Sequence, residues 1–186
     1  VGRSIRSITP SQDPESETLE TYDRQIRFLG KAGQQRLKGT KVGIIGLGGA
    51  GSLVVEYLAR LGVGSFVLVD DDIVELSNLS RIVGASVADA IGKSTKMSVA
   101  CKLILEANSH ADIEALIADV AKESIAKRLV GCDFLFLAAD SMRARLVFNA
   151  LVHQYLIPGV QIGAKVSTDP DGNILDLFSV NRPVRP

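Results

Sequence analysis

The chain has 186 residues, of which 46% are hydrophobic and 23% charged, so it can bury one sizeable core but is too short for two ordinary domains. Basic and acidic residues both number 21, which leaves no net field to favour nucleic acid or an anionic membrane surface as a partner. No apolar run approaches the about 20 residues that a membrane-spanning helix needs, and the first residues do not resemble a signal peptide.

Residues 1–18 mix Ser, Thr, Pro and acidic residues with few large apolar groups. Such a composition does not offset the entropy of ordering, so we expect a flexible N-terminal tail and one domain over residues 19–186. The chain lacks an initiator Met and stops at Pro186, so we expect this domain to be truncated at its C-terminus. Cys101 and Cys132 belong to no CxxC or Cys/His cluster, which gives no support for zinc and fits a reducing, cytoplasmic setting.

The first predicted helices follow the tail. Apolar residues recur at helical spacing at Leu19, Tyr22, Ile26 and Leu29. Gly30 and Gly33 interrupt this pattern, so we predict one helix and then a second short one that ends near residue 37.

The next segment alternates between strand and helix. Residues 41–45 form a short apolar run of β type, a glycine-rich turn follows, and residues 52–61 have the pattern of a buried helix closed by Gly62. Residues 66–69 are again apolar and end at an acidic triplet. This order predicts a β-α-β unit of a parallel sheet with the turn at its carboxyl edge.

The alternation continues through predicted helices at 96–106, 122–129 and 142–155 and predicted strands at 113–117 and 134–139. In the third helix, we interpret the stripe of Leu146, Ala150 and His153 as core. Two further strands, 161–168 and 174–180, flank turn residues 169–173 and predict a hairpin. The predicted fold is therefore α/β: a Rossmann-like, doubly wound, mostly parallel sheet with N-terminal helices and a C-terminal antiparallel hairpin.

The strongest local signal is the turn Gly46-Leu47-Gly48-Gly49-Ala50-Gly51-Ser52. Glycines there let the backbone approach a phosphate, and the following helix presents unpaired N–H groups to the anion. The turn alone does not separate NAD, FAD, S-adenosylmethionine and ATP, and close helix packing is the alternative without a ligand. Asp70, which follows the second strand, stands where a carboxylate commonly accepts hydrogen bonds from ribose.

The segment from Asp70 to Arg81 narrows the choice of nucleotide. Its sequence, Asp70-Asp71-Asp72-Ile73-Val74-Glu75-Leu76-Ser77-Asn78-Leu79-Ser80-Arg81, places carboxylates, an amide and a guanidinium at the edge of the sheet where ligands gather. A dehydrogenase has no evident use for this combination. It suits the triphosphate of a metal-bound nucleotide.

Together these motifs resemble the ubiquitin-activating-enzyme superfamily, which includes the sulfur-carrier adenylyltransferases of thiamine and molybdopterin biosynthesis. The N-terminal Tyr22-Asp23-Arg24-Gln25-Ile26 resembles the family's Tyr-x-Arg-Gln helix. The resemblance covers about residues 22–166 and continues through Gly92-Lys93-Ser94-Thr95-Lys96, Asn108, Ala139-Asp140, Arg143 and Arg145.

The resemblance implies a role for each matching residue. Gly46, Gly48, Gly49 and Gly51 would cradle phosphates, Asp70 would hold the ribose, and Asn78 and Arg81 would contact the triphosphate. Lys96 matches the family's phosphate-binding lysine better than Lys93, because its distance to Asn108 agrees with the family pattern; Lys93 stays a second nucleotide-binding candidate. Asp140 would carry the magnesium that accompanies ATP, and Asp72 would help to position the metal or the base. Arg24 would reach the active site of the other subunit of a homodimer.

The implied activity is ATP-dependent adenylation of the C-terminal carboxylate of a ubiquitin-like or sulfur-carrier protein, with release of pyrophosphate. Cations are needed because the carboxylate and the α-phosphate are both anionic. Alternatives are adenylation of a small-molecule or tRNA-linked carboxylate, an inactive scaffold subunit of a heterodimer, and an NAD-dependent oxidoreductase. For single residues, the alternatives are an interior ion pair between Arg81 and Asp140 and a solvated Lys93.

Overall fold

The computed structural model describes residues 20–184, and gives the backbone alone for 20, 164–166 and 177–181. The expected tail over residues 1–18 lies outside this range. A six-stranded sheet in the order β3-β2-β1-β4-β5-β6 forms the centre, with β5 and β6 antiparallel and every other neighbouring pair parallel. This confirms the predicted fold class. The strands are β1 (Lys41–Ile45), β2 (Ser65–Val69), β3 (Asp112–Leu116), β4 (Phe134–Leu137), β5 (Gly159–Thr168) and β6 (Ile174–Val184).

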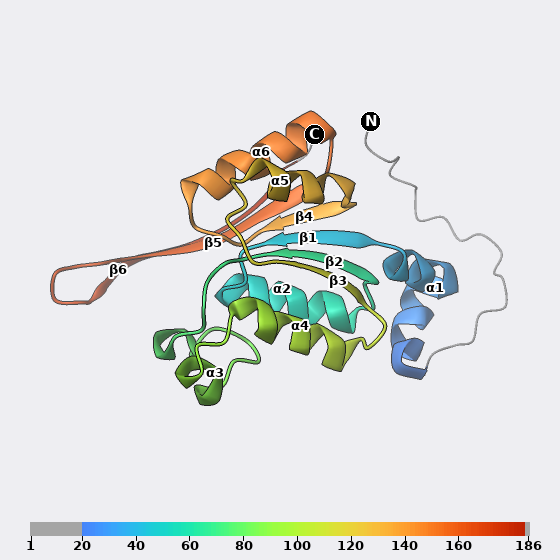
Figure 1. Cartoon of the computed structure of the whole chain (residues 1–186), viewed down its shortest axis with the longest axis horizontal. Helices are drawn as coiled ribbons and strands as arrows, with labels where there is room; N and C mark the ends of the chain where they lie inside the picture. The colour runs from blue at the N-terminus through green and yellow to red at the C-terminus, as the bar shows by residue number, and fades with distance from the viewer. Residues whose placement is uncertain (1–19, 185–186) are drawn as a thin grey trace.

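Helices cover both faces of the sheet, as Figure 1 shows. α2 (Gly49–Arg60) and α4 (Lys96–Ala107) lie on one face, and α5 (Glu123–Ala126) and α6 (Met142–Tyr155) on the other. The short α3 (Val87–Ile91) and the 3-10 turn Leu76–Asn78 were not predicted. No helix among residues 20–184 has the length and apolar character to cross a lipid bilayer.

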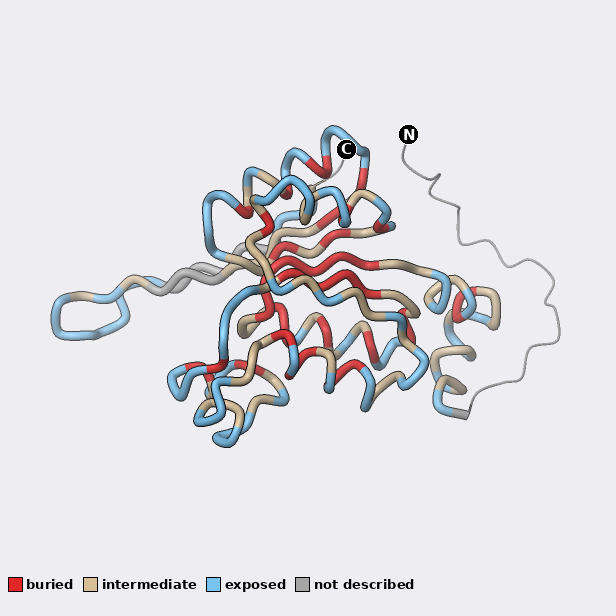
Figure 2. Tube along the Cα trace, in the orientation of Figure 1, coloured by how far each residue is buried: buried red, intermediate tan, exposed pale blue. Residues whose placement is uncertain are grey.

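Successive side chains of the central strands point to opposite faces of the sheet, so the hydrophobic core has two parts, one on each face. On β2, Phe66 and Leu68 pack against α2 and α4, whereas Val67 and Val69 pack against α6. Because both faces are covered, these strands are apolar at successive positions, as buried parallel strands are. Figure 2 shows this buried centre flanked by helices whose outer sides are exposed.

The predicted core stripe on α6 is wrong. Leu146 is 67% exposed, and Ala150 and His153 are also exposed. Helix α6 instead buries the neighbouring stripe, which consists of Ala144, Phe148, Leu151 and Val152. Both stripes have helical spacing, and burying the Phe148 ring removes more apolar surface from water.

Three predicted boundaries also differ. The helix predicted over 122–129 consists of α5 and then a 3-10 turn from Lys127 to Gly131. The strand predicted over 134–139 ends at Leu137, and the helix predicted over 52–61 begins earlier, at Gly49. The last glycines of the turn are therefore part of α2, and residues 138 and 139 belong to the loop after β4.

Helix α1 (Asp23–Lys38) confirms the expected pair of helices, because Gly30 breaks it with φ of 73°. Polar side chains fix α1 to the end of α2: Gln34 Nε2 donates to the carbonyl of Leu61 at 3.0 Å, and Gln25 Nε2 donates to Gln34 Oε1 at 3.0 Å. Since Leu61 follows the last residue of α2, α1 lies at the end of the sheet opposite to the glycine-rich turn (Figure 1).

The β5–β6 hairpin is confirmed and extends further than predicted. β5 pairs with β4 only from Gly159 to Gln161, and then continues to Thr168 against β6 alone. Figure 1 shows the two strands projecting as an arm beyond the body. At the tip of this arm, Asp169 accepts hydrogen bonds from the backbone and side-chain nitrogens of Asn173, which confirms turn chemistry there.

Candidate functional site

A pocket of about 450 Å³ opens at the carboxyl edge of the sheet. It lies where the strand order reverses between β1 and β4, which is the place where open α/β sheets bind ligands. Its volume is within the range of small-molecule sites, about 300–1,000 Å³. The residues that line it are Gly46, Gly48, Gly49, Asp70, Asp72, Ile73, Glu75, Asn78, Arg81, Lys96, Ala138, Ala139 and Asp140.

The floor of the pocket is the glycine-rich turn. Gly46 has φ of 90°, and a Cβ there would lie 2.7 Å from the backbone nitrogen of Ala139, so β1 and β4 approach too closely for a side chain. α2 begins at Gly49, so the unpaired N–H groups of its first turn adjoin the pocket. Gly51 is different: a Cβ there would lie 1.9 Å from the carbonyl oxygen of Gly46, which gives this glycine a packing role outside the pocket lining.

Asp70 closes one side of the pocket. Its Oδ2 accepts from the Leu47 N–H at 2.6 Å, and its Oδ1 accepts from the Asp72 N–H at 2.9 Å. Burial raises the pKa of Asp70, while these two backbone hydrogen bonds act in the opposite direction. Each carboxylate oxygen has a second lone pair, so Asp70 keeps capacity to accept a ligand hydroxyl.

The loop that follows β2 folds back over the turn. Arg81 packs on Gly49, where a Cβ would lie 3.2 Å from Arg81 Cβ, and its guanidinium donates to the Ser77 carbonyl at 3.0 Å. Ser52 holds this loop by accepting from the Val83 N–H at 3.0 Å. Asn78 is buried and donates to Ser77 Oγ at 3.1 Å. These contacts hold Arg81, which is an exposed residue, against the start of α2 and so at the lining of the pocket.

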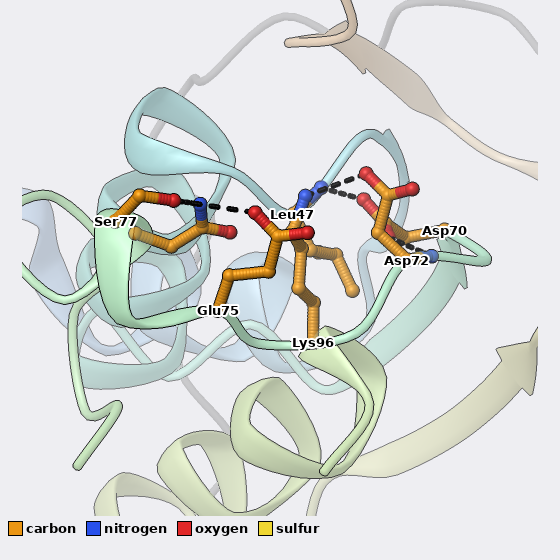
Figure 3. A network of polar contacts seen from close by, with 7 residues as sticks. Leu47, Asp70, Asp72, Glu75, Ser77 and Lys96 are labelled. Carbon is orange, nitrogen blue, oxygen red and sulfur yellow. Dashed lines mark hydrogen bonds and ion pairs between the residues drawn. The ribbon is translucent and has the colours of Figure 1, made fainter. Parts of the chain in front are cut away.

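Lys96 reaches the pocket from the first turn of α4. Its Nζ lies 2.6 Å from Asp72 Oδ2, as Figure 3 shows, and its backbone N–H donates to the Asp72 carbonyl at 3.0 Å. The pairing of Ile73 with Thr95 adjoins these contacts and ties the two segments together. Lys96 is therefore positioned by its backbone and by its side chain.

Glu75 is a pocket residue that the sequence analysis did not single out. Its Oε2 accepts from Ser77 Oγ at 3.2 Å, as Figure 3 shows. The same Ser77 Oγ accepts from Asn78 Nδ2. The available signal was its place in the polar segment from Asp70 to Arg81. Half of the residues in that segment line the pocket.

The pocket is short of positive charge for a triphosphate. Its lining carries four carboxylates, from Asp70, Asp72, Glu75 and Asp140, against the two cations Arg81 and Lys96. Among residues 20–184 no ion pair joins Arg81 to Asp140, and no three His, Cys, Asp or Glu side chains cluster closely enough to hold a metal. Mg²⁺ needs only one or two carboxylates when phosphates complete its shell, so the exposed Asp140 carboxylate fits a magnesium that arrives with the nucleotide.

Besides Gly51, two other predicted site residues lie outside the pocket lining. Arg24 is exposed on α1, which is fixed to the end of α2 remote from the pocket. Lys93 is exposed and does not line the pocket, as the solvated alternative predicts. The two cysteines also lie outside the pocket; burial raises the pKa of Cys101, and raises that of Cys132 to about 12.

The chain is similar in sequence to a known family of proteins. The sequence profile of the ThiF family matches residues 22–169. The SAMP-activating enzyme E1 of Haloferax volcanii is 35% identical over 133 residues, which cover 70% of this chain and 48% of that protein. The sulfur carrier protein ThiS adenylyltransferase of Bacillus subtilis is 35% identical over 130 residues, which cover 69% of this chain and 39% of that protein. The chain thus spans about half the length, or less, of these relatives.

One solved structure with a similar fold is a complex with ATP. The structure of E. coli tRNA N6-threonylcarbamoyladenosine dehydratase in complex with ATP aligns with a TM-score of 0.71 and 25% sequence identity. The alignment covers 82% of this chain and 63% of that one.

Proposed function

The chain belongs to the ThiF family, and we propose that its residues 19–186 form an adenylation domain, which binds ATP in the pocket and activates a carboxylate. The observation that carries this proposal is the convergence of a helix N-terminus, a half-buried aspartate and two cations on one pocket. The polar groups come from four separate segments of the chain. That arrangement suits the separate parts of a nucleoside triphosphate.

The phosphates are assigned to the glycine-rich turn. Gly46, Gly48 and Gly49 leave room for a phosphate beside the N–H groups of α2, where the helix dipole favours negative charge. Arg81 and Lys96 contact the triphosphate, and the Asn78 carbonyl holds Arg81 by accepting from its backbone N–H at 3.0 Å. Asp70 accepts hydrogen bonds from the ribose hydroxyls.

The proposed reaction requires cations that stabilise negative charge, and it requires no proton transfer. A carboxylate oxygen of the substrate attacks the α-phosphorus of ATP, and the bond to the oxygen that bridges to the β-phosphate breaks. The products are an acyl-adenylate and pyrophosphate, which leaves with the bonding electron pair. The substrate is already ionised, so no side chain must remove a proton. The cations instead offset the repulsion between two anions and the charge that gathers on pyrophosphate.

Two further cations are assigned to the reacting complex. Mg²⁺ held by Asp140 neutralises phosphate charge when bound. Arg24 of a second copy supplies the other cation, so the active form is a homodimer. The excess of carboxylates in the pocket supports this assignment, because ATP would otherwise enter a site of like charge. Arg24 is exposed on α1, and α1 lies at the end of the sheet away from the pocket (Figure 1), which supports donation of Arg24 to a neighbour.

The substrate is assigned as the C-terminal carboxylate of a ubiquitin-like or sulfur-carrier protein. A relative that is a sulfur-carrier-protein adenylyltransferase supports this choice. The structural neighbour that is a tRNA dehydratase supports the competing choice of a tRNA-linked carboxylate. Both substrates require the same activation step.

ATP–pyrophosphate exchange tests the proposal. We expect carrier-dependent exchange that is lost in Asp140→Ala, whereas Asp171→Ala, an exposed carboxylate on the arm, keeps full exchange. Exchange that needs tRNA or a small acid instead of any carrier would replace the substrate assignment. No exchange with any of these, or unchanged exchange in Asp140→Ala, contradicts the catalytic role and favours a scaffold subunit. A rise in thermal stability with NAD but not with ATP favours the oxidoreductase.

A further inference from the structure

Helix α1 is broken into two segments, and Arg24 lies on the first one. Gly30 has φ of 73° and ψ of 165°, which lie outside the helical range, so residues 23–29 and residues 31–38 are separate helical segments. A glycine link of this kind does not dictate the direction of one segment from the other. Contacts with the rest of the chain must therefore set the orientation of the segment that carries Arg24.

The hydrophobic core contributes little to that orientation. The large apolar side chains of the first segment are Ile26, Phe28 and Leu29. Among the described residues, none of the three packs against a buried hydrophobic cluster, and Phe28 is 88% exposed. Polar contacts are therefore left to attach this segment to the body of the protein.

Gln25 makes polar contacts that attach the first segment. Its Nε2 donates to the Leu61 carbonyl at 3.2 Å and to Gln34 Oε1 at 3.0 Å. Gln34, which is buried in the second segment, donates to the same carbonyl at 3.0 Å. Leu61 follows the last residue of α2, where carbonyls lack intrahelical partners, and one carbonyl can accept both amides. The two glutamines thus join both segments of α1 to one atom at the end of α2.

Arg24 takes its direction from these contacts. Tyr22, just before α1, packs its ring on Gly62, where a Cβ would lie 2.9 Å from Tyr22 Cζ, and this holds the start of the segment. Successive residues of an α-helix point about 100° apart, so Gln25, bound to the body, holds Arg24 to the side of the contact. Arg24 is accordingly exposed, and within residues 20–184 no ion pair involves it. Its guanidinium is free to reach another molecule.

We propose that Gln25 is a positioning residue for the cation that one copy of this chain donates to another. This inference rests on the proposed donation of Arg24 and names the contact that makes it possible. Gln25 itself is bound at the end of α2 remote from the pocket, so it acts only by fixing the direction in which Arg24 leaves α1 (Figure 1). Without that contact the guanidinium would spread over many positions, and a misplaced group loses much of its effect on the reaction.

The alternative is a purely structural role, in which Gln25 only caps the end of α2. Gln34 still caps the Leu61 carbonyl when Gln25 is absent, so this role predicts a small loss of stability. The two roles also differ in where the loss of activity occurs. A structural defect harms the chain that carries the substitution, whereas a positioning defect harms the pocket of the neighbouring chain.

Single and double variants in ATP–pyrophosphate exchange test the proposal. Gln25→Met keeps the length and the helix propensity of the side chain but removes the amide. Gln35→Met, the same substitution at an exposed position of the same helix, is the matched control. We expect Gln25→Met to lower kcat roughly tenfold, as the loss of its two hydrogen bonds predicts, and Gln35→Met to leave kcat unchanged. In an Arg24→Ala background, Gln25→Met should lower kcat no further, because it acts through Arg24.

Mixed dimers show in which chain the defect lies. When Gln25→Met is unfolded and refolded with an equal amount of Lys96→Met, the Gln25→Met chain of a mixed dimer keeps an intact pocket and receives a well-positioned Arg24. We expect about a quarter of wild-type exchange from the mixture, by random pairing. A defect confined to the pocket of the Gln25→Met chain would leave only about a twentieth.

Additive losses in the double variant, or no recovery in the mixture, make the role of Gln25 structural and overturn the proposal. Wild-type exchange in Gln25→Met, with Arg24→Ala impaired, overturns it too and leaves the donation of Arg24 standing. Unchanged exchange in Arg24→Ala refutes the donation, and no exchange in the wild type refutes adenylation; the proposal fails with either. Thermal unfolding checks that Gln25→Met is folded, and Gln25→Ala, with the same expectations, replaces it if it is not.

Discussion

Lys96 Nζ lies 2.6 Å from Asp72 Oδ2, although 24 positions separate the two residues in the chain. The Lys96 side chain is 12% exposed and that of Asp72 66% exposed, so the ion pair stands at the wall of the pocket with its acidic side toward solvent. An ammonium has three donors, so Lys96 can bind a phosphate while it keeps Asp72. The Asp72 carboxylate therefore holds the Lys96 ammonium in a fixed position at the wall of the pocket.

Removing the Lys96 charge should therefore lower the rate of ATP–pyrophosphate exchange. We expect Lys96→Met to lower kcat/KM for ATP by about ten- to a hundredfold, the value of a charge-assisted hydrogen bond to phosphate. Asp72→Asn, which loosens the ammonium without removing it, should cost about fivefold. Lys102→Met on the exposed side of the same helix is the control, since Lys102 pairs with Glu106 at 3.9 Å and does not line the pocket. Equal losses in Lys96→Met and Lys102→Met would contradict the assignment.

The glycines of the turn should separate into two classes. At Gly48 a Cβ meets nothing within 4 Å, so Gly48→Ala should change the free energy of unfolding by less than about 1 kcal/mol yet weaken ATP binding. At Gly51 a Cβ would collide with the Gly46 carbonyl, so Gly51→Ala should cost about 3 kcal/mol or more of stability. Urea unfolding and ATP titration measure the two effects. Normal ATP affinity in Gly48→Ala would remove this glycine from the phosphate site.

Arg24 should act across subunits. We expect Arg24→Ala and Lys96→Met each to lose most of the exchange activity alone, because each lacks one cation in every site. In a mixed dimer, the Arg24→Ala chain has an intact pocket and receives Arg24 from its neighbour. After equal amounts of the two are unfolded and refolded together, about a quarter of wild-type exchange should return, as random pairing of a two-fold dimer predicts. Persistent inactivity of the mixture, with dimers shown by light scattering, counts against donation between chains.

Nucleoside binding should depend on pH through Asp70. Burial raises the pKa of Asp70, so it takes up a proton at a higher pH than an ordinary aspartate, and the neutral carboxyl accepts hydrogen bonds from ribose less strongly. We expect the affinity for adenosine to fall about fivefold as pH drops through this raised pKa, and to be restored above it. Adenosine is preferred to ATP because phosphate itself titrates near about pH 6.

The matched control is Asp70→Asn, whose adenosine affinity should be low and independent of pH. Titration calorimetry at pH values on both sides of the raised pKa of Asp70 measures both proteins. A pH dependence that is the same in the two would assign it to another group.

Neither cysteine should be needed for exchange. The raised pKa of Cys132, about 12, keeps its thiol protonated at neutral pH, and burial raises the pKa of Cys101 as well. We expect Cys101→Ala and Cys132→Ala to retain exchange, with Cys132→Ala losing about 1–2 kcal/mol of stability from the cavity in the core. A carrier adduct that a thiol reagent cleaves, and that either substitution abolishes, would show a thioester and refute this.

The local pattern of the chain was enough to predict the sheet, the turn and most of the pocket. Strand and helix periods are properties of short segments, and the strand, glycine-rich turn and helix occur together within residues 41–61. Asp70, Asn78 and Arg81 follow at the edge of the sheet, so their position could be inferred from the order of the elements. Each of these inferences depends on residues that are close in sequence.

The tertiary structure decided what depends on contacts between distant segments. Backbone pairing of residues 72–74 with 94–96 brings Lys96 to the pocket and leaves Lys93 outside it. The approach of β1 to β4 makes Gly46 a pocket residue, while Gly51 packs against its carbonyl. The face that α6 buries, and the length by which β5 outruns β4, likewise follow from the register of strands that lie far apart in the chain. The spacing of residues in the sequence does not predict that register, because the register of the strands is fixed only when the whole sheet assembles.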